Sequence, residues 1–117
     1  MKNSLLWLLG AGITVIQLVI GNVIVFYGVL PALIGAHALL AAILLVIAIL
    51  GYARVKLPIE KRILIGNIVL VVIVGILGYL YFSLASPILV IIHFLLALGV
   101  LANFSVLYGF DVGQRYK

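Results

Sequence analysis

The sequence contains no cysteine and little charge: seven Lys or Arg and two Asp or Glu among 117 residues. The absence of cysteine excludes disulfide bonds, iron–sulfur clusters, thiol chemistry and cysteine-bound zinc. A soluble domain is about half apolar and about a quarter charged, whereas this chain is 68% hydrophobic and 8% charged. Because so few polar groups cannot cover a surface in contact with water, the composition excludes a soluble protein.

Four long apolar runs divide the chain, and each is close to the roughly 20 residues that a helix needs to cross a bilayer. We therefore predict an all-α membrane protein, with residues 1–117 forming a single domain, an up-down bundle of four transmembrane helices. The first run is too long for the core of a signal peptide, so we expect it to be retained as a span. The expected spans are about 5–27, 32–52, 63–82 and 88–110.

The basic residues are confined to the N-terminus, the C-terminus and the loop Arg54–Arg62 between the second and third runs. The other two connections, at 27–31 and 83–87, carry no charge. The positive-inside rule therefore predicts that both termini and the central loop are cytoplasmic, in a multi-pass protein of the cell membrane. The lipid bilayer is thus the expected partner. The net charge of +5 reflects this topology, and we expect no nucleic-acid partner.

An eleven-residue phrase occurs twice in the chain, as Pro31–Ala41 and as Pro87–Ala97. The two copies share the pattern P-x-L-x-x-x-H-x-L-L-A and contain the only two histidines, 56 positions apart (93 − 37). Leucine and alanine matches between apolar helices arise easily by chance, but proline and histidine matches at one offset do not. We interpret residues 1–55 and 56–117 as a two-fold internal repeat about an axis along the membrane normal.

The repeat places both histidines, His37 and His93, at one depth. Each lies six residues after its proline, which is about 9 Å along a helix. Because both helices run from outside to inside, we expect the imidazoles at the same level of the outer leaflet, on spans that are diagonal across the bundle. Helical spacing adds three neighbours to the face of each histidine. These neighbours are Leu33, Leu40 and Ala41 in the first copy and Leu89, Leu96 and Ala97 in the second.

An ionisable side chain at this depth indicates a function. Zinc requires three or four protein ligands, and no Asp, Glu or Cys lies within any expected span. Haem requires only axial ligands, because the porphyrin supplies four nitrogens. We therefore expect His37 and His93 to bind the iron of one haem b, with Ala41 and Ala97 leaving room for the macrocycle. The alternative is that the histidines join helices by hydrogen bonds without any cofactor.

Other polar side chains are expected near this level. Asn22 lies close in depth to the imidazoles, where it could accept a hydrogen bond from a ring N–H or join two helices. Tyr27 and Tyr81 are expected in the outer aromatic belt. Since no Lys or Arg is expected on that side, they are also candidate hydrogen-bond donors to haem propionates. Thr14 and Gln17 are expected to be packing contacts.

The segment Leu70–Gly78, followed by Pro87 and by the leucine-rich stretch His93–Leu98, resembles the haem A synthase family. The resemblance implies that the chain corresponds to one four-helix half of an eight-helix enzyme, with a histidine on its second and fourth helices. The family usually has a Glu three residues before the second-helix histidine and an Arg directly after it. Ile34 and Ala38 occupy those positions here, and the family's cysteine pair is also missing. The resemblance therefore implies haem binding without the catalytic apparatus.

Three kinds of function follow from these observations. The first is a b-type cytochrome that transfers electrons near the outer face, with quinol or a redox protein as its partner. The second is a compact haem A synthase or a cytochrome oxidase assembly protein, so enzymatic activity is left open. The third is a small four-helix transporter, or a structural subunit of a respiratory complex without haem. Small multidrug transporters use a Glu in their first span, where the nearest polar residue here is Gln17. A second copy of the chain or a respiratory-complex subunit is a further candidate partner.

Overall fold

The computed structural model describes residues 1–117, and the chain is entirely helical apart from its links and ends. The long helices are α1 (Asn3–Tyr27), α2 (Pro31–Arg54), α3 (Pro58–Leu84) and α4 (Pro87–Gly113). A short 3-10 turn, η1 (Gln114–Tyr116), follows α4. All four helices are long and apolar enough to cross a membrane, which confirms the prediction of four helices of this length and composition.

Proline and backbone geometry explain where the helices begin and end. The three prolines of the chain, Pro31, Pro58 and Pro87, each occupy the first helical turn of their helix. The fixed φ of proline suits this position, where its missing N–H would have no helical partner. At the other ends, Gly28 follows α1 with φ 109°, and Ala85 follows α3 in the left-handed region with φ 48°. These positive φ values stop the helices and leave short links.

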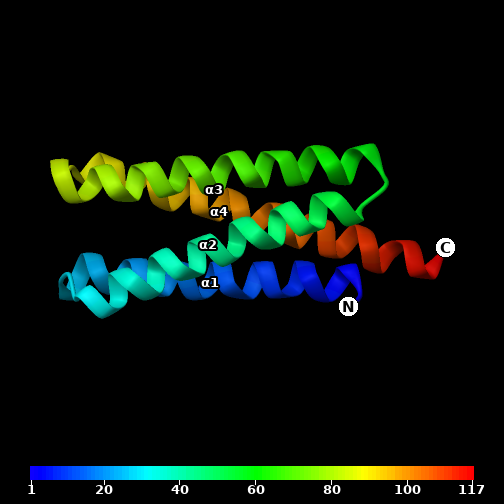
Figure 1. Ribbon diagram of the computed structural model, residues 1–117, viewed down its shortest axis with the longest axis horizontal. Coiled ribbons are helices and arrows are strands. Elements are labelled where there is room, and N and C mark those ends of the chain that lie inside the picture. Colours follow the sequence, from blue (N-terminus) through cyan, green and yellow to red (C-terminus); the bar gives the residue numbers. More distant parts are fainter.

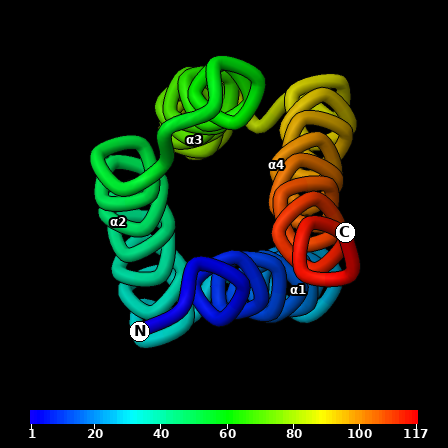
Figure 2. The backbone as a smooth tube through the Cα atoms, turned by 90° about the vertical axis from the view of Figure 1, so that its right-hand side faces the viewer, coloured from blue at the N-terminus to red at the C-terminus, as the bar shows by residue number.

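The four helices form a bundle in which consecutive helices lie side by side and run in opposite directions (Figure 1). Viewed along the bundle, α2 lies opposite α4 and α1 lies opposite α3 (Figure 2). Close backbone approaches occur between neighbours around this square, including α4 with α1, and not across its diagonals. The bundle measures 48 × 21 × 19 Å. Any contact across a diagonal is therefore made by side chains.

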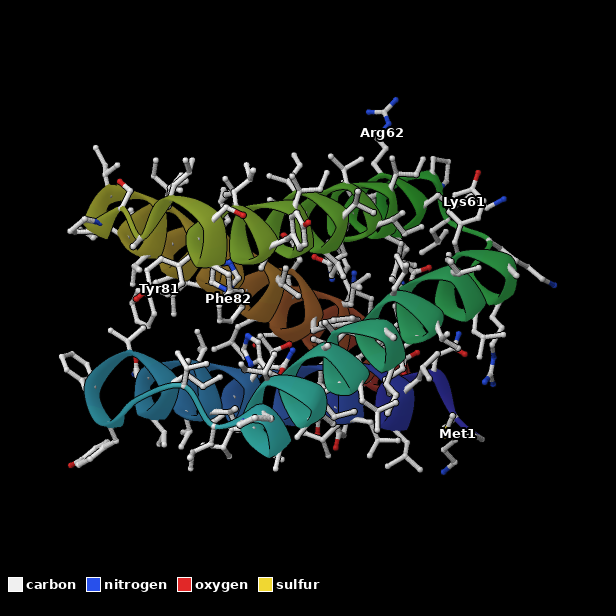
Figure 3. The ribbon with its side chains drawn as sticks, turned by 60° about the vertical axis from the view of Figure 1, so that its left-hand side comes forward. Met1, Lys61, Arg62, Tyr81 and Phe82 are labelled. Atoms are coloured by element: carbon white, nitrogen blue, oxygen red, sulfur yellow. The ribbon has the colours of Figure 1, made fainter.

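The two ends of the bundle differ completely in charge. Both termini and the link between α2 and α3 lie at one end (Figure 1), and all nine charged side chains are found there; we call it the charged end. The opposite end, with the links 28–30 and 85–86, is called the uncharged end. Lys61 and Arg62 mark the charged end in Figure 3, whereas Tyr81 and Phe82 lie between the helices toward the uncharged end.

The apolar core fills the half of the bundle nearest the charged end. Trp7 and Phe104 are fully buried there and stack with their ring centroids 6.5 Å apart. Beyond the helix midpoints, toward the uncharged end, only Gln17 and Ile24 are buried. The bundle is therefore tightly packed in one half and loosely packed in the other. The core cluster consists of Leu6, Trp7, Leu44, Ile47, Ala48, Val55, Leu64, Val71, Val100, Phe104 and Leu107.

Two glycines leave the space that these aromatic rings occupy. A Cβ atom built on Gly51 would lie 2.5 Å from the Trp7 ring, and one built on Gly10 would lie 2.8 Å from the Phe104 ring. Both distances are too short for carbon atoms in contact, so only glycine permits the observed approach. Small residues at helix interfaces are the usual means of close packing in membranes, where lipid is as apolar as the helices themselves.

Hydrogen bonds tie the termini together at the charged end. Arg115 pairs with Asp111 at 3.1 Å, one turn earlier on α4, and donates to the Ser4 hydroxyl of α1. Arg54, the last residue of α2, donates to the backbone carbonyl of Met1. The end of the chain and the end of α2 are thus both attached to the beginning of α1.

The close contact between Gly51 and the Trp7 ring predicts that the free energy of unfolding depends strongly on Gly51. In Gly51→Ala the new methyl group overlaps the rigid Trp7 ring, and overpacking of this kind costs about 1–3 kcal/mol. The matched control is Gly12→Ala on α1, where no atom lies within 4 Å of the added carbon and the better helix propensity of alanine is the main effect. Reversible unfolding in detergent micelles measures both variants. Equal stability of Gly51→Ala and wild type would contradict this account of the packing.

Candidate functional site

The loosely packed half of the bundle contains a cavity of about 120 Å³ that touches all four helices. No Lys, Arg, Asp or Glu lines it. Val25, Phe82 and Phe94 line the cavity and are also 37–49% exposed, so the cavity opens at the surface of the bundle between helices. Its polar lining residues are Thr14, Gln17, Asn22, His37, Tyr81 and His93.

The two histidines meet across the diagonal of the bundle. His37 of α2 and His93 of α4 have ring centroids 6.1 Å apart and ring planes inclined by 34°. Since the backbones of α2 and α4 do not approach each other closely, the two rings themselves bridge the space between these helices. Both rings line the cavity. The chain thus brings its only two histidines to one place from positions far apart in sequence.

The residues that share a helical face with the histidines lie on the inner side of α2 and α4. Ala41 and Ala97 line the cavity one turn from the imidazoles, where their small side chains leave space open. Four of the six leucines in the two copies, those that share the histidine face, are half-buried without lining the cavity. These leucines are Leu33, Leu40, Leu89 and Leu96.

The structure brings two of the three outer polar candidates to the cavity. Asn22 and Tyr81 line it from α1 and α3. Asn22 makes no hydrogen bond with either imidazole, because neither ring has a side-chain partner. Tyr27 is 87% exposed at the end of α1 and does not line the cavity. Tyr27 is therefore placed at the surface of the bundle rather than at the site.

Each imidazole packs on a glycine of the preceding helix. A Cβ built on Gly21 of α1 would lie 3.5 Å from Cε1 of His37, and one built on Gly78 of α3 would lie 3.2 Å from Cε1 of His93. The Nδ1 atoms of both rings are buried without a hydrogen-bond partner, whereas the Nε2 atoms are not buried in this way. Each ring is thus packed on its Nδ1 side, which leaves Nε2 as the nitrogen available to a ligand in the cavity.

The spacing of the rings fits a single metal ion bound between them. An imidazole nitrogen binds a first-row metal at about 2.0–2.1 Å, and with about 1.1 Å from nitrogen to ring centroid, two imidazoles on opposite sides of one ion have centroids roughly 6.3 Å apart. The observed separation is 6.1 Å. No cluster of three His, Cys, Asp or Glu side chains exists in the chain. The donor set therefore fits an ion whose remaining ligands come from a macrocycle.

Sequence reasoning missed two polar contacts between helices. Gln17, expected to be a packing contact, donates from Nε2 to the backbone carbonyl of His37 at 2.8 Å. Asn67 is fully buried and accepts a hydrogen bond of 2.9 Å from the Asn103 amide, which joins α3 to α4 in the packed half. The available signal was the same in both cases: an amide side chain within a long apolar run, which usually bonds to a neighbouring helix.

Comparisons with protein-family models, with curated proteins and with solved structures find no match to this chain.

The contact between Gly78 and His93 predicts a selective effect on one histidine. In Gly78→Val the added methyl groups would occupy the space beside Cε1 of His93, so the ring must rotate or shift. Gly75→Val is the matched control one turn away on α3, since no atom lies within 4 Å of its added Cβ. With histidine-selective ¹⁵N labelling in nanodiscs, Gly78→Val should move the His93 ring resonances and leave those of His37 nearly in place. Equal shifts from both glycine variants would contradict the packing described above.

Proposed function

We propose that the chain is a membrane-embedded b-type cytochrome that holds one haem b between His37 and His93 and transfers electrons. The observation that carries the proposal is the pair of rings 6.1 Å apart across the bundle. Haem bound there would supply a reversible one-electron ferric–ferrous couple. If His37 and His93 both hold the iron, oxygen would find no free position to bind. This favours electron transfer over oxygen chemistry.

The other side chains of the cavity have roles that suit such a cofactor. The apolar walls would keep water from a bound haem, and Ala41 and Ala97 leave room on the histidine-bearing faces of α2 and α4. A haem is larger than the cavity volume of about 120 Å³, so its edge would extend into the openings between helices. Asn22 and Tyr81 would donate hydrogen bonds to the propionate carboxylates, because no Lys or Arg lines the cavity.

The orientation that we propose places the charged end in the cytoplasm and the cavity in the outer half of the cell membrane. All seven Lys and Arg lie at the charged end, and short cytoplasmic loops are enriched in these residues. Both termini would then be cytoplasmic. Electrons would be exchanged near the outer face, where quinol in the bilayer or a redox protein could approach the openings of the cavity.

The resemblance to the haem A synthase family supports haem binding more than haem modification. The two positions where that family usually has Glu and Arg beside the second-helix histidine are Ile34 and Ala38. Neither residue lines the cavity, and no carboxylate or guanidinium group from elsewhere in the chain does so. General acid–base catalysis in the cavity would therefore fall to the histidines and to Tyr81. We propose that these histidines are occupied as iron ligands, which leaves electron transfer as the function.

Loss of either histidine should abolish stable haem binding. Protein purified from haem-supplied cells should show a sharp ferrous α-band, and His37→Ala and His93→Ala should each remove that band because one axial ligand is lost. Ser105→Ala on α4 is the matched control, since this hydroxyl is exposed and bonds only to its own helix. An unchanged spectrum in both histidine variants would contradict the proposed ligands, and so would a colourless wild-type protein.

The absence of cysteine allows a direct test of the proposed orientation. Val29 and Lys56 are both exposed, in the links at opposite ends of the bundle. In intact cells a membrane-impermeant maleimide should label Val29→Cys and should label Lys56→Cys only after the membrane is permeabilised. The reverse pattern would contradict the proposed topology, and labelling of both positions in intact cells would do the same.

A further inference from the structure

We infer that Gln17 is a positioning residue for His37, fixing the α2 backbone at the level where this helix supplies its ligand. This inference rests on the proposed haem site. The Gln17 side chain reaches from α1 to α2, and its Nε2 donates to the carbonyl oxygen of His37 itself, at 2.8 Å. The bond thus connects α1 to the main chain of the residue whose imidazole lines the cavity.

The bond lies where the bundle has few other attachments. Gln17 is 8% exposed, and Ile24 is the only other buried residue in the half nearest the uncharged end. The other side-chain hydrogen bonds between helices lie in the packed half or at the charged end. The interior of a bilayer contains no water that could replace a protein partner, so the Gln17 amide depends on this hydrogen bond. The Gln17 bond is therefore the one hydrogen bond from an amide side chain between helices at the level of the cavity.

The cost of burying this amide supports a positioning role over simple space filling. Gln17 Oε1 is buried without any donor, and an unsatisfied buried acceptor is destabilising. Leucine or methionine would occupy a similar volume at this position without that cost. A glutamine at this position is explained if the hydrogen bond donated by its Nε2 atom is needed there.

The two histidines are held in different ways. The residue that corresponds to Gln17 in the second half, 56 positions further on, is Ile73, which has no group to donate. No side chain donates to the backbone of α4 near His93; that ring rests on Gly78. An effect of Gln17 should therefore fall on the His37 side of the iron. Without this hydrogen bond, α2 could slide along its axis or rotate about it. The bond that His37 Nε2 would make to the iron would then tilt.

The test compares haem-loaded Gln17→Leu with Ser105→Ala. Ser105 lies on α4 outside the cavity, and its exposed hydroxyl bonds within its own helix, to Leu101. We expect Gln17→Leu to release haem to an acceptor protein about fivefold faster, as the loss of one buried hydrogen bond predicts. The g-values of its ferric low-spin signal in electron paramagnetic resonance should also shift, because they report the geometry of the axial imidazoles. Ser105→Ala should stay within about twofold of wild type in release rate, with unchanged g-values.

A second variant keeps the test decisive if Gln17→Leu folds poorly. Gln17→Glu retains a donor at this position, because a carboxyl group in an apolar site stays protonated, and it should reproduce the wild-type g-values at pH 5. The titratable side chains lining the cavity are His37, His93 and Tyr81; Glu60 and Asp111 lie at the charged end.

Three outcomes would overturn parts of the account, and they can be told apart. Wild-type g-values in Gln17→Leu, or equal changes in Gln17→Leu and Ser105→Ala, would remove the positioning role while leaving the haem site intact. A shifted signal in Gln17→Glu at pH 5 would also count against the hydrogen bond. Failure of the wild-type protein itself to bind haem would overturn the proposed function, and the role of Gln17 with it.

Discussion

The structure depends on the seating of two aromatic rings on glycines, Trp7 against Gly51 and Phe104 against Gly10. Within a bilayer apolar surface has no reason to leave lipid for another helix, so helices associate where they can pack closely or exchange hydrogen bonds. This chain concentrates such contacts in the half near its charged end. There the rings fill the centre of the bundle, and the Asn67–Asn103 pair joins α3 to α4.

The loosely packed half of the bundle depends on the tightly packed half. Because the helices are fixed at the charged end, their other halves can stand apart without losing the bundle, and the cavity lies between them. Polar side chains then define what the cavity can hold. His37 and His93 bridge it along one diagonal, and Gln17 donates a hydrogen bond to the backbone carbonyl of His37. A cofactor bound by both histidines would join α2 to α4 and supply the contacts that this half of the bundle lacks.

Much of the fold could be predicted from the sequence, because its determinants are local. The length of each apolar run, the prolines at helix starts and the placement of charge at one end predict four spanning helices, and the structure confirms four helices long and apolar enough to span a membrane. The repeated phrase also pointed to His37 and His93 as the pair to consider. The repeat works as a signal because proline sets the helix start and a fixed spacing then sets the depth of each ring.

The side-chain contacts between helices could not be predicted from the sequence, for a physical reason. These helices are apolar on all sides, so periodicity does not determine how each one is rotated about its axis. The partner of Gln17, the inclination of the two rings and the exposure of Tyr27 all depend on that rotation. Asn22 illustrates the same point: its depth was close to that of His37, yet the structure gives it no hydrogen bond to an imidazole. Depth follows from counting along one helix, whereas contact requires the packing of several.

The central claim is that two histidines from the two halves of the repeat hold one haem between them. The most direct measurement is electron paramagnetic resonance of the purified ferric protein, together with the ratio of haem to polypeptide from a pyridine haemochrome assay. The account predicts one haem b per chain and a low-spin signal typical of two imidazole ligands. A preparation without haem, or with high-spin iron that is retained when His37 and His93 are both replaced by alanine, would contradict it.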